Sequence, residues 1–389
     1  MSEPQRHALV IGAGLAGAAT CAALARRGWQ LTLLDAASGP AQGASALPVG
    51  MLSPHVTRSP TPLSRLSGLG VAATLAELRR LVPPGRGWQP CEVDNRGHDP
   101  GRWPAALVRP AALVQAWLDE AHQLGALDTH WQAAVHRLEH HRATGWHALD
   151  AQGRSLAQAP LVVVAAAWGS HALIAGASGL MQADDLPLRP VKGQMSLAAL
   201  EGEPLAPRPQ RDSGVYVPLY EDSGLPPAWP ARLWAMGSTY ERGDASTDLS
   251  DAAHERNASS LQAICPAAAQ RLREAAARGQ LRGWAQVRCA SLDRLPLVGA
   301  VPDGEALLAL MAQAGSRRGR VPLGDTPRHP GLYLLGALGS RGLTLAHWCA
   351  SRLAAQMDGE HPSEHDAALL RAIDPARFAW KRARRQPTG

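Results

Sequence analysis

The sequence predicts an α/β fold in which a parallel-sheet domain is combined with a second domain built on an antiparallel sheet. Three observations predict this fold. Residues 8–35 have the pattern of a strand, a glycine-rich turn, a helix and a second strand that ends in an acid. Residues 161–166 form a continuous apolar run, which is typical of a strand buried in a parallel sheet. Residues 187–240 are rich in proline and contain short strand-like pieces, which favours an antiparallel sheet.

The first segment has the glycine spacing of a dinucleotide-binding turn. Gly12 permits the sharp turn, Gly14 lets a pyrophosphate approach the backbone, and Gly17 lets the helix pack on the strand. The N-terminus of that helix offers N–H groups and a favourable dipole to phosphates. Asp35 ends the second strand, where a carboxylate accepts a hydrogen bond from a ribose hydroxyl, which favours FAD or NAD over NADP. A signal sequence or an ordinary buried helix would leave the glycine spacing unexplained.

The composition is that of a soluble globular protein. The chain has 389 residues, 46% of them hydrophobic and 19% charged, so we expect two closely associated domains. A net charge of +6 favours an anionic partner. We find no further apolar run that could span a bilayer and no targeting segment, and we expect a cytoplasmic protein without a membrane partner. The five cysteines lack CxxC spacing, which indicates neither zinc nor disulfides.

Residues 71–150 alternate between helical and strand-like patterns. Apolar spacing predicts helices over 71–82, where Pro83 ends the helix, and over 110–124. Residues 84–103 are an excursion punctuated by glycine and proline, and residues 131–150 are strand-like. The strand-like stretch contains four histidines. We expect no metal site there, because their spacing in strands separates the ligands; the histidines are His136, His140, His141 and His147.

The second half of the chain contains the strands and helices expected for the antiparallel domain. A further strand and helix expected for the parallel-sheet domain follow them. Strand-like pieces are expected at 194–197, 214–219, 232–237 and 283–301, and helices at 251–264 and 267–278. A long insertion at 301–330 is followed by an apolar strand at 331–335. A second glycine turn at 336–343 then precedes a helix over 344–357, whose N-terminus is another place for polar ligand atoms.

Several motifs give the chain a resemblance to the D-amino-acid-oxidase superfamily of FAD enzymes, in its glycine and sarcosine oxidase branch. They are GASALPVGMLSP at 43–54, RPVKGQ at 189–194 and VRCASLDRLPLVG at 287–299. Within that branch the chain resembles the FAD-dependent oxidoreductase half of bifunctional tRNA 5-methylaminomethyl-2-thiouridine biosynthesis proteins. This second resemblance adds MGSTYERGDASTDLS at 236–250, LGALGSRGL at 335–343 and LAAQMDGEHP at 353–362.

The resemblance implies an FAD-binding, Rossmann-like domain of the D-amino-acid-oxidase type, assembled from separate segments. FAD-binding segments are expected at 1–75, 111–186 and 285–360, substrate-domain segments at 76–110 and 187–284, and a basic tail at 361–389. Besides the glycines and Asp35, the implied FAD contacts are Ala13, Ser45, Gly50, Met51, Leu52, Val135, Gly339, Ser340, Arg341, Gly342 and Leu343.

The resemblance also implies substrate-binding residues. Arg288 matches the carboxylate-binding arginine of glycine oxidases, and a guanidinium can bind a carboxylate with two parallel hydrogen bonds. Tyr216 and Tyr240 lie in segments that face the flavin in relatives, with core packing as the alternative. Lys192 is either a cation near the flavin that activates oxygen or a solvated loop residue. Cys289 suggests a covalent flavin link, although free cysteines are usually small buried apolar residues.

A tRNA partner raises further candidates. The basic tail could bind phosphates through Arg377, Lys381, Arg382, Arg384 and Arg385, unless it is merely solvated. Trp88 and Trp103 could stack on bases, but packing is the simpler explanation. Because the chain starts at the FAD motif, the resemblance leads us to expect that the methyl transfer is done by a separate methyltransferase or not at all.

The resemblance therefore predicts oxidative removal, as glyoxylate, of the carboxymethyl group from 5-carboxymethylaminomethyl-(2-thio)uridine at the tRNA wobble position, leaving 5-aminomethyl-uridine. A free-standing oxidase of glycine, sarcosine or another small amine is the alternative. A flavin-containing RNA-binding protein without turnover is a third reading, against which Arg288 and the two glycine turns argue.

Overall fold

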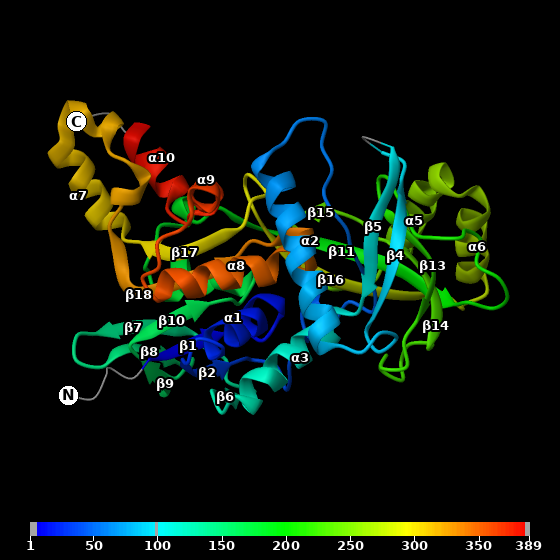
Figure 1. The fold of residues 1–389 in the computed structure, drawn as a ribbon, viewed down its shortest axis with the longest axis horizontal. Helices are drawn as coiled ribbons and strands as arrows, with labels where there is room; N and C mark the ends of the chain where they lie inside the picture. The colour runs from blue at the N-terminus through cyan, green and yellow to red at the C-terminus, as the bar shows by residue number, and fades with distance from the viewer. Residues whose placement is uncertain (1–5, 98–99, 386–389) are drawn as a thin grey trace.

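A computed structural model describes residues 6–97 and 100–385 of the chain. The molecule is elongated, with a mainly parallel sheet at one end and an antiparallel sheet at the other (Figure 1). Strands β11 (Leu188–Ala199) and β16 (Arg282–Ser291) pair with each other and extend between the two ends. Within the described ranges, no helix is long and apolar enough to cross a membrane.

Six strands form the mainly parallel sheet, in the order β17, β18, β10, β1, β2, β6. Their bounds are β1 His7–Ile11, β2 Gln30–Leu34, β6 Leu127–His130, β10 Leu161–Val164, β17 Leu297–Pro302 and β18 Arg328–Gly336. Val10 of β1 is paired in parallel with Val163 on one side and with Leu33 on the other. The first four residues of the apolar run at 161–166 are therefore a largely buried parallel strand, as predicted, and only β17 runs antiparallel to its neighbour in this sheet.

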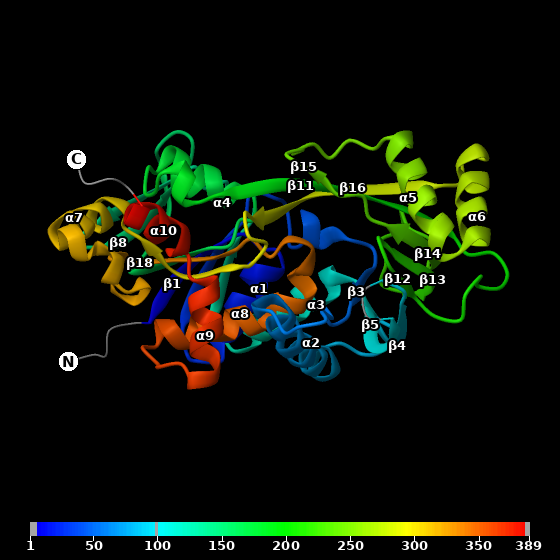
Figure 2. The ribbon, with the colours of Figure 1, turned by 90° about the horizontal axis from the view of Figure 1, so that it is seen from above.

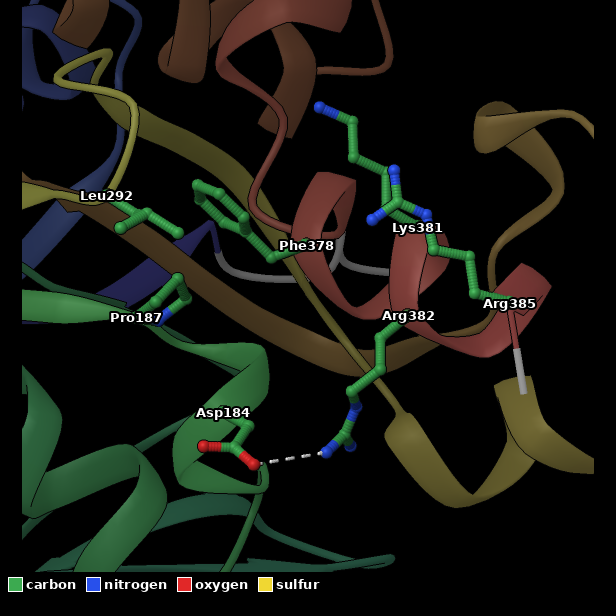
Figure 3. Close-up of a pocket in the computed structure, with 7 residues that line it drawn as sticks. All are labelled: Asp184, Pro187, Leu292, Phe378, Lys381, Arg382 and Arg385. Atoms are coloured by element: carbon green, nitrogen blue, oxygen red, sulfur yellow. Dashed lines mark ion pairs between the residues drawn. The ribbon is translucent and has the colours of Figure 1, made fainter.

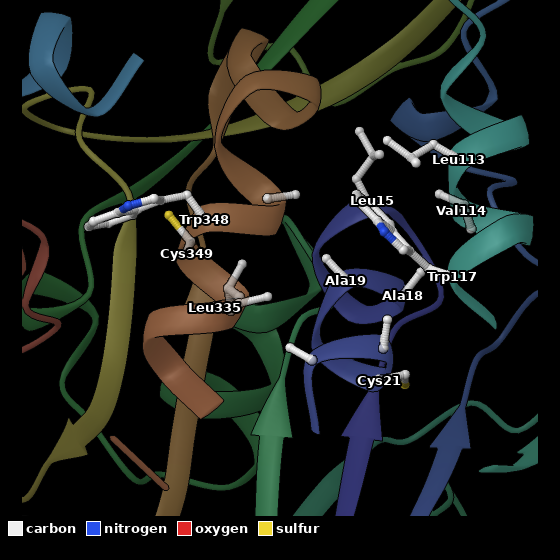
Figure 4. Close-up of a cluster of buried hydrophobic side chains, with 14 of the residues drawn as sticks. Leu15, Ala18, Ala19, Cys21, Leu113, Val114, Trp117, Leu335, Trp348 and Cys349 are labelled. Carbon is white, nitrogen blue, oxygen red and sulfur yellow. The ribbon is translucent and has the colours of Figure 1, made fainter. Parts of the chain in front are cut away.

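Small residues on the first helix let two other helices pack closely against it. Helix α1 (Leu15–Ala25) lies between α3 (Pro110–Gln123) and α8 (Gly342–Met357), as Figure 4 shows. Ala18, Ala19 and Ala22 have no exposed surface, and Trp117 of α3 is fully buried in the same cluster. Close packing of this kind is stabilising through many small dispersion contacts, and it holds the glycine turn that precedes α1.

The other face of the parallel sheet is covered by a three-stranded sheet. Its strands are β7 (Arg137–His141), β8 (Gly145–Leu149) and β9 (Ser155–Ala159), and it contributes Trp146 to a core cluster with Leu9 of β1. The predicted strand-like stretch at 131–150 is thus a hairpin. The hairpin brings the rings of His141 and His147, which lie on neighbouring strands, to 4.6 Å between centroids, a proximity that spacing along one strand does not reveal. In the described part of the chain, no three metal-binding side chains are grouped together.

The antiparallel end is a nine-stranded sheet in the order β15, β11, β14, β13, β12, β4, β5, β3, with β16 also paired to β11. The further bounds are β3 Gly50–Leu52, β4 Trp88–Asn95, β5 Gly101–Val108, β12 Gln210–Arg211, β13 Val215–Glu221, β14 Arg232–Gly237 and β15 Glu241–Arg242. Most pairs are antiparallel, as predicted, although β12 and β4 pair in parallel. The excursion at 84–103 supplies β4 and the first three residues of β5, so it is part of this sheet.

Helices α5 (Asp251–Ile264) and α6 (Pro266–Ala277) pack on one face of the antiparallel sheet (Figure 2). Ser250 caps α5 by accepting a hydrogen bond from the N–H of Ala253, and Pro266 begins α6, where its missing N–H costs nothing. These helices occupy one face of the sheet, and the opposite face is left to the cavity described below.

Several predicted boundaries shift. Helix α2 (Pro62–Leu81) starts nine residues before the expected helix, because Thr61 and Ser64 form a capping box. The insertion at 301–330 contains α7 (Gly304–Ala314), capped by Asp303. The expected tail folds as α9 (Glu364–Ile373) and α10 (Arg377–Arg385). The expected segment boundaries at 75/76 and 284/285 fall inside α2 and β16.

The remaining helical segments are single turns or short stretches. They are η1 Ala44–Ala46, α4 Gly169–His171, η2 Ala172–Ala177, η3 Ala183–Asp185, η4 Gly315–Arg320, η5 Leu323–Asp325 and η6 Gly339–Arg341. Segment η1 lies in the small-residue loop before β3, and η6 is the second glycine turn, directly before α8. These two segments contribute to the site.

Candidate functional site

A cavity of about 910 Å³ lies between the two sheets. One wall is the edge where the parallel strands end, with Ile11, Asp35 and Ala165, and the opposite wall comes from β11, β13 and β16. Ligand sites in α/β folds form outside the carboxyl ends of parallel strands, where several loops converge. The cavity has the position and size of a cofactor and substrate site.

The first glycine turn is compatible only with glycine at two positions. Gly12 has φ +107°, and a Cβ there would lie 2.6 Å from the carbonyl oxygen of Ala165. A Cβ at Gly17 would lie 1.7 Å from the carbonyl oxygen of Gly12, so Gly17 lets α1 pack on the turn. Gly17 does not line the cavity, and its role is the close helix packing that the motif predicts.

The N-terminus of α1 is open toward the cavity. Gly14 is the N-cap and supplies no side-chain cap, and the N–H of Leu15 donates to Ser45 Oγ at 3.0 Å. Ser45 accepts this bond and keeps its own hydroxyl proton for a ligand. The cradle therefore offers backbone N–H groups, a hydroxyl and the helix dipole to a phosphate.

Asp35 is held in place at the end of β2. Its Oδ2 accepts from the N–H of Ala13 at 2.6 Å and its Oδ1 from the N–H of Ala37 at 2.8 Å. The carboxylate lines the cavity beside the cradle and retains lone pairs for a ribose hydroxyl. A phosphate cradle followed by a fixed carboxylate fits the pyrophosphate and ribose of a dinucleotide, so these residues fit FAD.

The second glycine turn faces the same cavity. Gly339 has φ +56°, and α8 begins at Gly342 without a side-chain cap, so its N–H groups and dipole point at a ligand. Of the predicted FAD contacts, all but Gly17 and Leu52 line the cavity. Leu52 is a correction: it has no exposed surface and packs into the helical core, while Gly50 and Met51 of the same strand face the cavity.

Arg288 lies in the cavity wall on β16, and its guanidinium is already hydrogen-bonded by protein atoms. Nη2 donates to the carbonyl oxygens of Thr239 (2.7 Å) and Lys192 (3.1 Å). Nη1 donates to the hydroxyls of Ser238 and Ser340, each at 3.0 Å, and Nε makes a longer contact with the carbonyl of Val191. Burial lowers the pKa of Arg288. A ligand carboxylate can therefore contact Nη1 only if it replaces the two serine hydroxyls; otherwise it binds to those hydroxyls.

Tyr240 and Arg341 complete this part of the wall. The ring of Tyr240 lies 5.1 Å from Arg288 Cζ and is 46% exposed, so its hydroxyl is available to a ligand. In the part of the chain that the structure describes, the guanidinium of Arg341 makes no hydrogen bond or ion pair, although it lines the cavity. Two cations and three hydroxyls thus converge beside the second glycine turn.

Tyr216 does not reach the cavity, and its predicted substrate contact is wrong. Alternate residues of a strand face opposite sides, and Val215 and Val217 line the cavity. Tyr216 therefore points into the cluster under α5 and α6, where it has no exposed surface. Burial raises the pKa of its hydroxyl to about 12.

Lys192 is also on the face away from the cavity, which Gly193 and Met195 line. Its Nζ donates to Ser246 Oγ at 2.9 Å and lies 3.6 Å from Asp244 Oδ2. Neither expectation for this residue is correct: Lys192 is not a cation facing the cavity, and it is a buried residue of β11 rather than a solvated one.

Cys289 touches the cavity but is a buried thiol, and burial raises its pKa to about 12. A thiol that stays protonated is a poor nucleophile, which argues against a covalent link to a flavin.

Sequence reasoning missed the contribution of Arg211. This residue lines the cavity, and its Nη1 donates to Ser53 Oγ at 2.7 Å and to the carbonyl oxygen of Pro54 at 2.9 Å. It therefore ties the antiparallel sheet to the loop that follows β3. No motif surrounds Arg211, so only its position in β12 next to the cavity reveals it. Ser238, by contrast, lies in the MGSTY segment that the resemblance highlighted.

The candidate RNA contacts divide into buried and exposed residues. Trp88 is buried and its Nε1 donates to the carbonyl oxygen of Val82 at 2.7 Å, so it is a core residue and not a stacking platform. Arg377 is 3% exposed and pairs with Asp293 at 2.8 Å, which removes it from the candidates for phosphate binding. Lys381 and Arg385 are exposed on α10.

Three comparisons place the chain among known proteins. The family described as DAO, FAD dependent oxidoreductase, matches residues 7–98 and 96–356. The tRNA 5-methylaminomethyl-2-thiouridine biosynthesis bifunctional protein MnmC of Verminephrobacter eiseniae is 38% identical over 435 residues, which cover 95% of this chain and 63% of that protein. The chain thus spans less than two thirds of this relative. Because the relative is named as bifunctional, it gives no support to a separate methyltransferase.

Two solved structures share the fold. Glycine oxidase from Geobacillus kaustophilus superposes with a TM-score of 0.69 at 17% identity, covering 96% of this chain and 99% of the other. Iminodiacetate oxidase from Chelativorans sp. BNC1 gives a TM-score of 0.63 at 19% identity, covering 92% and 96%. At these identities the likeness concerns the fold.

Proposed function

This chain belongs to the family of FAD-dependent oxidoreductases, and from that premise we propose that it oxidises the glycine unit attached to C5 of a tRNA wobble uridine. The substrate is 5-carboxymethylaminomethyl-(2-thio)uridine. The carboxymethyl group leaves as glyoxylate, and 5-aminomethyl-uridine remains on the tRNA. Oxidation removes two electrons and two protons from the substrate: the Cα–H would leave as a hydride equivalent for FAD, and the N–H proton would pass to solvent. Water then adds to the resulting C=N bond, which releases the amine and supplies the oxygen of glyoxylate.

One observation carries the proposal: Arg288, Ser340, Tyr240 and Arg341 converge beside the second glycine turn. Such a set suits a carboxylate whose α-carbon must be fixed against the flavin. Ser238 and Ser340 each accept a hydrogen bond from Arg288, so their hydroxyl protons can be donated to the carboxylate. Correct positioning of the reacting carbon alone supplies several kcal/mol of the acceleration.

When bound, FAD would supply the hydride acceptor for the carbon between the amine nitrogen and the carboxylate. The amine has to be neutral for this step, because its lone pair assists the loss of hydride. Arg288 and Arg341 are cations in the cavity wall, and nearby positive charge disfavours an ammonium. The wall thus favours both the carboxylate and the neutral amine of the substrate.

The relative from Verminephrobacter eiseniae supports tRNA as the substrate, since its name specifies tRNA modification. The alternative is a free-standing oxidase of glycine, sarcosine or a similar amine, because the carboxylate-binding set would suit a small amino acid equally well.

Anaerobic mixing distinguishes these functions. The FAD-loaded protein is mixed in turn with tRNA bearing the carboxymethylaminomethyl group, with tRNA lacking it, with glycine and with sarcosine. We expect rapid bleaching of the flavin absorbance and one glyoxylate per flavin only with the modified tRNA. Bleaching by glycine or sarcosine alone would establish the small-amine oxidase in its place.

A further inference from the structure

Four cationic or titratable side chains gather where the cavity opens to solvent. We name the set Arg211, Arg294, Arg341 and His55 the cationic rim. Arg211 and Arg341 line the cavity, and the exposed residues beside them, Asp212, Ser213 and Ser340, mark its opening. Arg294 is exposed on the turn between β16 and β17.

The members of the rim influence one another electrostatically. Burial and the charge of Arg341 lower the pKa of Arg211. The pKa of Arg341 is lowered, chiefly by burial and also by the charge of Arg294, while Tyr240 opposes this shift. Burial and the charges of Arg341, Arg211 and Arg294 lower the pKa of His55. The backbone agrees with this grouping: Arg211 donates to the carbonyl oxygen of Pro54, next to His55, and Ala290 at the end of β16 forms a bridge with Leu338, just before Arg341. The four groups therefore lie in one positive field.

No carboxylate neutralises the three arginines among residues 6–97 and 100–385. Asp212 also lines the cavity, but it forms no ion pair with any of them. Arg211 is held by neutral oxygens of Ser53, Pro54 and Asn95, and the guanidinium of Arg341 has no hydrogen-bond partner in the same ranges. Uncompensated cations that are partly buried are costly, and a bound anion would remove that cost.

The rim continues into a second positive surface. Leu292, two residues before Arg294, is 51% exposed and lines a groove with Phe378, Lys381, Arg382 and Arg385 (Figure 3). Arg382 pairs with Asp184 and Asp185, which leaves Lys381 and Arg385 unpaired in the described structure. The β16–β17 turn thus connects two positive surfaces, because it contributes Arg294 to the cationic rim and Leu292 to the groove with Lys381 and Arg385.

We propose that the cationic rim binds a backbone phosphate next to the modified uridine, and that the RNA strand continues over the β16–β17 turn to Lys381 and Arg385. This inference rests on the proposed function, because it takes RNA as the molecule that carries the substrate group. It assigns the carboxylate of the modified base to the Arg288 side of the cavity and the flanking phosphate to the rim.

Affinity for RNA as a function of salt tests the proposal. The FAD-loaded protein, Arg294→Gln and Arg385→Gln are titrated with a fluorescent anticodon stem–loop RNA at several salt concentrations. Arg142→Gln is the matched control, because Arg142 is an exposed arginine in the β7–β8 turn and does not line the cavity. Flavin content and the visible spectrum verify that each variant is folded.

Each lost phosphate contact should lower the slope of log affinity against log salt by about 0.7–0.9. We expect Arg294→Gln and Arg385→Gln each to show this change and to bind the stem–loop about 3- to 10-fold more weakly, whereas Arg142→Gln matches the unaltered protein. A slope for Arg294→Gln equal to that of Arg142→Gln would overturn the proposal, even if the modified tRNA still bleaches the flavin.

A second arm distinguishes RNA from a small dianion. If Arg294→Gln leaves RNA affinity unchanged but raises the KM for iminodiacetate, the rim binds a second substrate carboxylate and the proposal is wrong. If the unaltered protein shows no salt-dependent RNA binding and is bleached only by free amino acids, the proposed function fails together with the rim's assignment.

Discussion

Arg288 Nη1 donates a hydrogen bond to Ser340 Oγ at 3.0 Å, which joins strand β16 of the antiparallel sheet to the glycine turn that precedes α8. The same guanidinium holds carbonyl oxygens of Lys192 and Thr239. Arg288 therefore fixes the distance between the antiparallel sheet and the turn expected at the flavin.

Replacing Ser340 by alanine tests this contact. The variant removes one acceptor of Arg288 and one hydroxyl donor to the carboxylate, and a hydrogen bond to a charged group is worth about 1.5–3 kcal/mol. We expect kcat/KM for the accepted substrate to fall about 10- to 100-fold, with FAD still bound. Ser213→Ala is the control, since Ser213 also lines the cavity. Equal values for the two variants would contradict a role for Ser340.

Arg288→Lys separates charge from geometry. Lysine keeps the positive charge but cannot span Ser238, Ser340 and the two carbonyl oxygens at once. We expect kcat/KM to fall at least about 100-fold, because small displacements of the reacting groups have effects of this size. Arg282→Lys changes the other end of β16 and should retain activity. Full activity of Arg288→Lys would mean that a point charge is sufficient.

Two glycine substitutions should have opposite effects. Gly17→Ala would place a Cβ 1.7 Å from the carbonyl oxygen of Gly12, so we expect loss of FAD binding and a lower melting temperature. Gly68 lies in α2, and a Cβ added there would have no neighbouring atom within 4 Å. Gly68→Ala should therefore stabilise the protein by about 0.5–1 kcal/mol. Thermal unfolding and flavin content measure both, and an FAD-replete Gly17→Ala would refute the packing argument.

The carboxylate of Glu77 should make stability depend on acid pH. Burial opposes its ionisation, but Arg26, His347, Arg80 and Trp117 together lower the pKa of Glu77 to about 2. Because this value lies below the unfolded pKa of about 4.3, the stabilisation is complete above about pH 5 and is lost as the pH falls toward 2.

Glu77→Gln should therefore lower the free energy of unfolding by about 1.5–3 kcal/mol near pH 7. The difference from the unaltered protein should shrink as the pH falls below about 4. Urea titrations at several pH values measure it, and Glu203→Gln is the control because Glu203 is exposed. A difference independent of pH would show that the ionised form contributes nothing.

Local patterns in the sequence were sufficient to predict the first glycine turn and Asp35, which form the part of the site expected to bind the cofactor. The spacing of Gly12, Gly14 and Gly17 depends on contacts within one strand–turn–helix unit, and the acid at Asp35 follows at the next strand end. The apolar run at 161–166 could be assigned to a parallel strand for the same reason, since burial on both faces requires such a run.

The substrate half could be predicted only in part. Arg288 and Tyr240 were found through family motifs, and the structure places both in the cavity wall. Tyr216 and Lys192 were expected at the site but lie on the opposite faces of their strands, because residue type alone does not show which face of a strand a side chain occupies. A shift of one residue along a strand exchanges the two faces of a sheet, and only the pairing of β13 and β11 with other strands decides which face meets the cavity.

The sequence by itself thus determined the fold class, the dinucleotide turn and the family, because each depends on short-range spacing of glycines, apolar residues and acids. Tertiary structure alone decided which side chains share the cavity. Arg211 meets the loop at Ser53 and Pro54, which lies far away along the chain, and Arg294 comes beside Arg341 through the β16–β17 turn. Such proximities arise from the packing of the two sheets, which no local pattern encodes.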